Sequence, residues 1–206
     1  EAQAEKDALT KIAATLGEGK LASTTELTEA ERKIVSHMNM LTMKPILYSL
    51  NGKSGSTITD ERAEKAYAYI TSLGSQYVHV DAGTERELND VGEEDKAAFR
   101  SELGVSIDGL VELIRGAYAT LGQITFFTTG PKESHAWTIS RGASAPEAGA
   151  AIHSDFKDKF IRAEVIGSAE LLASGSYAAA REKGQVRTEG REYIVKDGDV
   201  MVFLHS

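Results

Sequence analysis

The chain of 206 residues contains no cysteine, only three prolines and no long hydrophobic run. Without cysteine it can form no disulfide framework, no thiolate metal site and no cysteine nucleophile. The few prolines and the absence of low-complexity tracts argue against long disordered stretches. No apolar run approaches the roughly 20 residues that a membrane-spanning helix needs, and no signal-peptide pattern opens the chain. We therefore expect a globular, cytoplasmic protein without a membrane partner.

The net charge of −8 is concentrated in the first part of the chain. Residues 1–120 contain 13 basic and 20 acidic side chains, whereas residues 121–206 contain 10 and 11. Because phosphate contacts dominate the affinity for nucleic acids, the acidic first part is a poor general nucleic-acid binder. We expect no DNA partner, and an RNA partner fits the electrostatics of the second part only.

The first 122 residues are predicted to form helices followed by a parallel α/β unit. The short apolar run at 44–50 is typical of a buried strand, and 75–80 predicts a second strand after an intervening helix. Loops are expected to follow these strands, at 51–56 and 81–85. Strand, helix and strand joined by short loops indicate a βαβ unit in a parallel sheet. Further helices are expected at 4–16, where the chain is expected to begin inside a longer helix, and at 28–38, 93–103 and 107–121.

From about residue 123 the sequence changes to β-rich runs. The runs at 124–130 and 135–142 predict a β-hairpin, and Pro146 opens a short helix. Strands with one packed helix in fewer than 90 residues fit a small α+β domain of the β-grasp class. The other elements are expected as strands at 160–166, 191–195 and 200–205 and a helix at 168–175.

A GKS triplet at 52–54 follows the first predicted strand and suggests a phosphate-binding loop. The full motif needs a glycine five residues before Gly52, and Leu47 stands there, which favours a simple polar loop. The five histidines form no HExxH motif and no pair four residues apart, so no zinc site is expected. His153 and Asp155, with the serine between them, are too close in sequence for catalytic-triad geometry. We therefore expect no catalytic residue and no metal site in this chain.

Three strings are specific enough to indicate a family. They are NMLTMKPILYSLN (39–51), GLVELIRGAYATLGQITFFTTGPKESHAWTISRGASAPEAGAAIHSDFKDKFIRAEVI (109–166) and EGREYIVKDGDVMVF (189–203). Over residues 40–206 the chain resembles the YchF-type Obg-like ATPase family. The resemblance implies an α/β P-loop NTPase (G) domain with a helical insert, followed by an α+β TGS domain with the ubiquitin-like β-grasp fold.

The resemblance implies three regions with separate roles. Residues 1–40 match the end of the coiled-coil insert, 41–122 the C-terminal half of the G domain, and 123–206 the TGS domain. In the family, the phosphate loop and the magnesium-binding residues precede the insert. The full-length protein is therefore expected to be a ribosome-associated hydrolase that uses ATP or GTP with Mg²⁺. The part seen here, without the N-terminal half of the G domain as its partner, is expected to be inactive and to bind no nucleotide tightly.

The base-recognition side of the nucleotide site falls on this chain by the same resemblance. Asn51 matches the asparagine that faces the purine, and Gly52 matches the position whose backbone approaches the base. The family pattern is NxxE, but Ser54 stands where the glutamate is expected. A carboxylate only accepts hydrogen bonds whereas a hydroxyl also donates, so the family's base preference does not carry over. From the residues alone, Asn-Gly is also a common turn pair. The loop on the other side of the base matches Asp81, Ala82 and Gly83.

Basic residues of the second part are candidates for contact with ribosomal RNA. Acidic residues are interleaved with them, so a solvated surface explains the same pattern. Two further functions stay open: a stand-alone TGS-type module that binds RNA or the ribosome, and a degenerate scaffold without nucleotide binding, which the absent glutamate would suit. The candidate residues are Lys157, Lys159, Arg162, Arg187 and Arg191, and the acidic ones are Asp158, Glu164 and Glu189.

Overall fold

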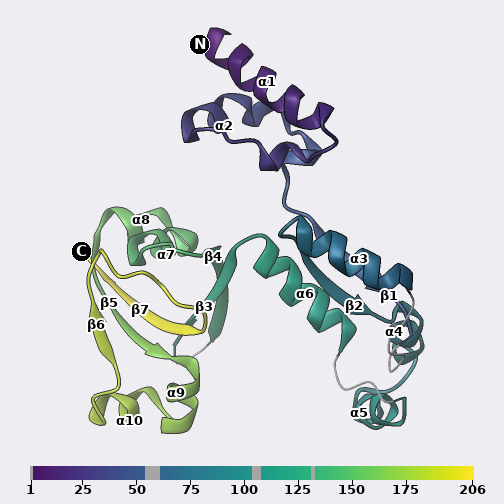
Figure 1. Ribbon diagram of the computed structural model, residues 1–206. Coiled ribbons are helices and arrows are strands. Elements are labelled where there is room, and N and C mark those ends of the chain that lie inside the picture. The colour runs from purple at the N-terminus through teal and green to yellow at the C-terminus, as the bar shows by residue number, and fades with distance from the viewer. Residues whose placement is uncertain (1, 54–60, 104–107, 131–132) are drawn as a thin grey trace. The chain divides into compact units, whose positions relative to one another are not determined.

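The computed structural model describes residues 2–53, 61–103, 108–130 and 133–206. The chain forms two compact units, Glu1–Thr120 and Leu121–Ser206, which are described separately (Figure 1). None of the helices in the described ranges is long and apolar enough to span a membrane.

The first unit begins with helices whose ends follow from local capping. Helix α1 (Ala2–Gly17) ends just before Gly19, which has a positive φ of 75°. Helix α2 (Glu29–Val35) starts at a capping box, in which Thr28 and Glu31 each accept the other's backbone N–H. The helices predicted at 4–16 and 28–38 are confirmed. Short 3₁₀ turns lie at Ala22–Thr24, Ser36–Met38 and Leu41–Met43, and the small core consists of Ala8, Ile12, Ala22 and Val35.

The predicted βαβ unit is confirmed as β1 (Leu47–Asn51), α3 (Glu61–Ser72) and β2 (Gln76–Val80). The two strands are parallel, and their last residues lie opposite each other. The strand predicted at 44–50 forms from Leu47 on, but the prediction that it is buried is wrong, since no residue of β1 is buried. Among the described residues, β1 pairs with β2 alone, so one edge of β1 has no neighbouring strand there.

Three helices follow β2: α4 (Ala82–Leu88), α5 (Glu93–Glu102) and α6 (Gly109–Thr120). The expected loop at 81–85 is wrong. The chain turns directly into α4 because the side chain of Asp81 accepts the Thr84 N–H at 3.0 Å and caps the helix. Helix α6 packs against the strands through Gly116.

The second unit is a five-stranded sheet in the order β4-β3-β7-β5-β6. The two central strands, β3 and β7, are parallel, and all other neighbours are antiparallel. The predicted hairpin is confirmed as β3 and β4. The strands are β3 (Gln123–Thr129), β4 (Ser134–Ser140), β5 (Phe160–Gly167), β6 (Arg187–Glu189) and β7 (Asp199–His205). The helices are α7 (Ala145–Ile152), α8 (Ser154–Asp158), α9 (Ser168–Ser174) and α10 (Tyr177–Glu182).

Each face of this sheet has its own apolar cluster. Val165 of β5 and Met201 of β7 lie opposite each other and pack with Ala148 of α7. The next pair along the strands, Ile166 and Val200, packs instead with residues of α9 and α10. Successive strand residues point to opposite faces, so the helices cover the sheet from both sides.

One strand prediction in this unit is wrong. The segment 191–195 forms only an isolated bridge, between Ile194 and Ser144, and the short edge strand is β6 instead. The reason is that the backbone of this segment pairs with the start of α7. The Tyr193 carbonyl accepts the Ala145 N–H at 2.8 Å, and the Val195 N–H donates to the Ala143 carbonyl at 3.0 Å.

Candidate functional site

The residues that follow β1 and the start of α4 meet at the carboxyl ends of the parallel strands β1 and β2. The Gly52 N–H donates to the Val80 carbonyl at 3.1 Å, which extends the strand pairing by one residue. The side-chain oxygen of Asn51 accepts the Ala82 N–H at 3.2 Å. The end of β1 and the start of α4 are therefore joined by a hydrogen bond between residues 31 positions apart. In open α/β sheets, ligands bind at this end of the strands.

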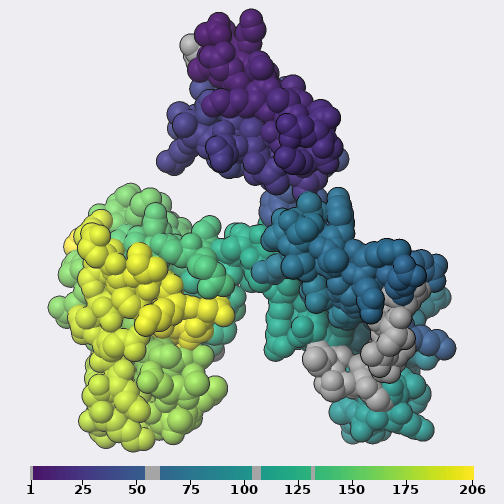
Figure 2. Space-filling model, viewed as in Figure 1, coloured from purple at the N-terminus to yellow at the C-terminus, as the bar shows by residue number. Residues whose placement is uncertain are grey.

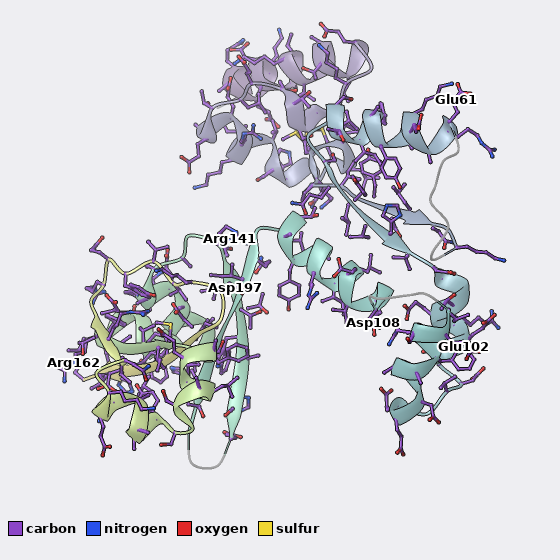
Figure 3. The ribbon with its side chains drawn as sticks, turned by 60° about the horizontal axis from the view of Figure 1, so that its bottom comes forward. Glu61, Glu102, Asp108, Arg141, Arg162 and Asp197 are labelled. Carbon is purple, nitrogen blue, oxygen red and sulfur yellow. The ribbon has the colours of Figure 1, made fainter. Side chains whose placement is uncertain are left out.

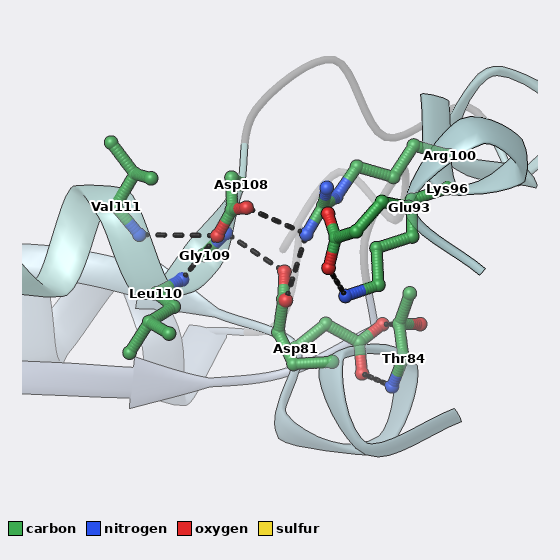
Figure 4. Close-up of polar contacts among 10 residues, drawn as sticks. Asp81, Thr84, Glu93, Lys96, Arg100, Asp108, Gly109, Leu110 and Val111 are labelled. Atoms are coloured by element: carbon green, nitrogen blue, oxygen red, sulfur yellow. Dashed lines mark hydrogen bonds and ion pairs between the residues drawn. The ribbon is translucent and has the colours of Figure 1, made fainter. Parts of the chain in front are cut away.

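Asp81 is occupied with holding the start of α4. One carboxylate oxygen accepts the Thr84 N–H at 3.0 Å and the other accepts the Thr84 hydroxyl at 2.9 Å (Figure 4). Ala82 and Gly83 form the first turn of α4 and are exposed. The structure thus brings together Asn51, Gly52, Asp81, Ala82 and Gly83, whereas Ser54 lies outside the described residues.

A second group of polar residues fixes α4 to the two helices that follow it. The Glu85 carboxylate accepts the Gly109 N–H at 2.8 Å and pairs with Arg100 at 3.0 Å. Arg100 also pairs with Asp108 at 2.8 Å, and Asp108 in turn accepts backbone N–H groups of the first turn of α6 (Figure 4). This group links α4, which starts at the carboxyl end of β2, to α5 and α6.

Sequence reasoning missed this polar group because its members lie up to 24 residues apart. The only local signal is Asp108 directly before an apolar helical run, which is a common capping position. In the described part of the chain, no three His, Asp or Glu side chains are arranged to hold a metal ion.

In the second unit, four of the five candidate basic residues lie around the start of β5. Arg191 donates to the Phe160 carbonyl at 2.9 Å, and its guanidinium lies 5.8 Å from the centre of the Phe160 ring. Lys159 directly precedes Phe160, and its carbonyl accepts the N–H of the last residue at 3.3 Å. Arg162 of β5 is exposed at the surface of the unit (Figure 3). Lys157 lies on α8 and is also exposed.

The fifth candidate, Arg187, takes part in a different set of contacts. It pairs with Glu189 at 3.3 Å and lies 3.4 Å from the hydroxyl of Tyr193. That hydroxyl donates to Asp199 at 2.8 Å, and burial together with this hydrogen bond raises the pKa of Tyr193 to about 12. Arg187 therefore helps to hold the segment before β7 in place.

Comparison with known proteins shows which family this chain is similar to. The family YchF-GTPase_C, described as a protein of unknown function (DUF933), matches residues 123–206. A Bacillus subtilis protein named ribosome-binding ATPase YchF is 40% identical, and the alignment covers 98% of this chain and 57% of that protein. The chain matches the C-terminal portion of YchF. A Haemophilus influenzae YchF of the same name is 37% identical over 98% of this chain and 56% of its own length.

Solved structures agree with the YchF match. The Schizosaccharomyces pombe YchF GTPase has a TM-score of 0.82 and 26% identity, over 97% of this chain and 54% of that one. A GTP-binding protein from Pyrococcus horikoshii has a TM-score of 0.58 at 13% identity, which shows the fold alone. The fold is therefore α/β and NTPase-like, as in these proteins. The chain spans little more than half the length of the YchF relatives that it matches.

Proposed function

We propose that this chain carries the base-side wall of the nucleotide site and the ribosome-binding unit of a YchF-type ATPase. The ligands of the whole protein are ATP or GTP with Mg²⁺, and its partner is the ribosome. The relatives named ribosome-binding ATPase support both halves of this proposal. The base-side residues are Asn51, Gly52, Asp81, Ala82 and Gly83, with Ser54 as a further candidate.

The observation that carries the nucleotide half is the hydrogen bond between Asn51 and Ala82. It orients the Asn51 amide at the carboxyl end of the sheet, beside the exposed first turn of α4. Because the oxygen of this amide accepts from Ala82, its nitrogen is the atom suited to donate to a ring acceptor of a purine. These groups fit a base.

Phosphate and Mg²⁺ contacts supply most of the catalysis in phosphoryl transfer, and a bound Mg²⁺–nucleotide would supply the phosphoryl group. The residues assigned here hold the base only. We therefore expect this chain alone to hydrolyse no nucleotide and to bind a nucleoside as weakly as it binds the corresponding triphosphate.

For the second unit, the strand order supports a TGS-type β-grasp domain. In β-grasp domains a hairpin and a later strand form a mixed sheet with two parallel central strands, and a helix packs across it. The parallel pair β3 and β7, the hairpin of β3 and β4, and α7 on the sheet agree with this pattern. The exposed Lys157, Lys159 and Arg162 are then the candidates for contact with RNA phosphates.

Titration with adenosine and guanosine, followed by NMR of the ¹⁵N-labelled chain, tests the nucleotide half. We expect shifts at the amides of residues 51–53 and 81–84, with a Kd of roughly 1 mM or weaker because only base contacts are made. Asn51→Ala should remove these shifts, and the matched variant Asn39→Ala in the first unit should keep them. Shifts elsewhere, or micromolar Mg²⁺-dependent binding of ATP, contradict the proposal.

A further inference from the structure

Helix α5 is held to its unit by polar contacts rather than by burial. None of its ten residues is buried. Acidic residues occupy its first turn and Arg100 its last turn, which suits the helix dipole. Arg100 pairs with Glu85 and Asp108 and fixes the side of the helix that faces α4 and α6. The space-filling view shows the teal residues of this helix at the molecular surface (Figure 2).

Another face of α5 carries exposed apolar side chains instead of ion pairs. Phe99 and Leu103 are four residues apart, so they lie on one side of the helix, and each is 41% exposed. Asp95 lies one turn before Phe99, and Glu102 three residues after it, on the same side. This face, called here the α5 face, consists of Asp95, Phe99, Glu102 and Leu103.

The surroundings of the α5 face are strongly acidic. Residues 85–102 contain seven acidic and three basic side chains. Two of the acids, Glu85 and Glu93, are paired with bases of the same region. Glu102, labelled in Figure 3, is exposed, as are the other acids of α5. Such a surface repels RNA phosphates and attracts a positively charged partner.

We propose that the α5 face docks into an apolar groove on a basic protein, with Phe99 and Leu103 in the groove and the acids against lysine or arginine on its rim. An amphipathic helix that binds a groove presents apolar residues at a spacing of three or four, and the α5 face has this spacing. The ion pairs of Arg100 fix the helix before binding, which lowers the ordering cost. The inference rests on the proposed function, because a ribosome partner makes ribosomal proteins the basic proteins to test.

The experiment measures binding of the full chain to proteins extracted from purified ribosomes and freed of RNA. Phe99→Ser/Leu103→Ser should weaken binding about tenfold or more, as expected for central apolar contacts of an interface. Asp95→Asn/Glu102→Gln should weaken it less and reduce its salt dependence. Leu172→Ser is the matched control, because this leucine is 81% exposed on the second unit. Lysozyme, a basic protein used as a second probe, should bind without any effect of the serine changes.

Binding that is absent, or that ignores the serine changes while circular dichroism shows the variant folded, overturns the inference. If the serine variant does not fold, Asp95→Lys/Glu102→Lys takes its place, and unchanged binding has the same meaning. A chain that binds intact ribosomes but not the extracted proteins contradicts this inference alone. A chain that binds the extracted proteins through the α5 face but not intact ribosomes supports it and contradicts the proposed function.

Discussion

Gly116 is the residue at which helix α6 approaches the two parallel strands most closely. A Cβ there would lie 2.6 Å from Val78 Cγ1 and 3.3 Å from both Leu47 Cδ atoms. Valine is stiff about χ1, so it does not rotate away easily. The sequence does not predict this contact, because a glycine within a helical pattern also occurs where the helix is merely weakened.

Gly116→Ala should therefore destabilise the first unit. Overpacking costs about 1–3 kcal/mol, and the better helix propensity of alanine returns about 1 kcal/mol. We expect a net loss of up to about 2 kcal/mol in the free energy of unfolding, measured by urea titration. Gly17→Ala, where a Cβ would meet nothing within 4 Å, is the control and should not destabilise. Equal stability of the two variants would mean that α6 does not pack on β2 through Gly116.

Tyr193 makes the stability of the second unit depend on pH in alkali. Burial and the bond to Asp199 raise its pKa to about 12 from the ordinary value of 10.0. The folded state thus holds the proton more tightly, so the contribution of Tyr193 is complete below about pH 10 and is lost as pH rises towards 12. In Tyr193→Phe, the fall in the free energy of unfolding over this window should be smaller than in the wild type. Tyr69→Phe, at a tyrosine that is 60% exposed, should keep the full fall; equal slopes in all three proteins contradict the assignment.

At the scale of elements, regular patterns predicted the regular structure. The capping residues before α2, the apolar runs of the βαβ unit and the strings of β3, β4, β5 and β7 were sufficient. Helices α8 and α10 were not predicted. Helix α4 and strand β6 were also not predicted, for two different reasons. The first depends on one side-chain cap at Asp81, and the second is a three-residue edge strand set by its pairing with β5. Tertiary contacts, rather than propensity, also turn 191–195 away from the sheet.

The candidate site, too, was predicted only in part from the sequence. The resemblance located the ends of β1 and β2, but not the bond between Asn51 and Ala82 that joins them. It also could not show that Arg187, although exposed like Lys157 and Arg162, pairs with Glu189 inside its unit. Residues with the same charge are distinguished only by their partners in space.

The capping box of α2 gives a prediction for this element. Thr28→Ala removes the acceptor for the Glu31 N–H and should lower the free energy of unfolding by about 1 kcal/mol, as N-cap replacements do. Thr10→Ala is the matched control, because Thr10 lies inside α1 and donates to the Lys6 carbonyl at 2.8 Å. Alanine is the better helix former there, so the control should be neutral or slightly stabilising. A Thr28 variant as stable as the control, by thermal melting at the same pH, contradicts the role of the cap.

For the whole molecule, the two units differ in chemistry as well as in fold. The first unit is acidic and exposes large apolar side chains on α6, among them Leu110, Val111 and Ile114. The second unit has nearly balanced charges, two apolar clusters and exposed basic residues near the start of β5. Because phosphate contacts dominate binding to RNA, we expect the salt-dependent contacts with ribosomal RNA to lie on the second unit.

Co-sedimentation of the full chain with purified ribosomes, over a range of salt, tests this central claim most directly. Arg187 and Arg191 are left unchanged because both donate hydrogen bonds within the unit, whereas the Lys159 side chain makes only a 3.6 Å ion pair with the exposed Asp155 in the described part of the chain. The triple variant Lys157→Glu/Lys159→Glu/Arg162→Glu should bind more weakly, and the slope of log affinity against log salt should fall by about 2–3 if each residue meets one phosphate. The control, Lys33→Glu/Lys65→Glu/Arg86→Glu in the first unit, should keep that slope. An unchanged slope in the first triple variant, or a lower slope in the control alone, would contradict the assignment of the phosphate contacts to the second unit.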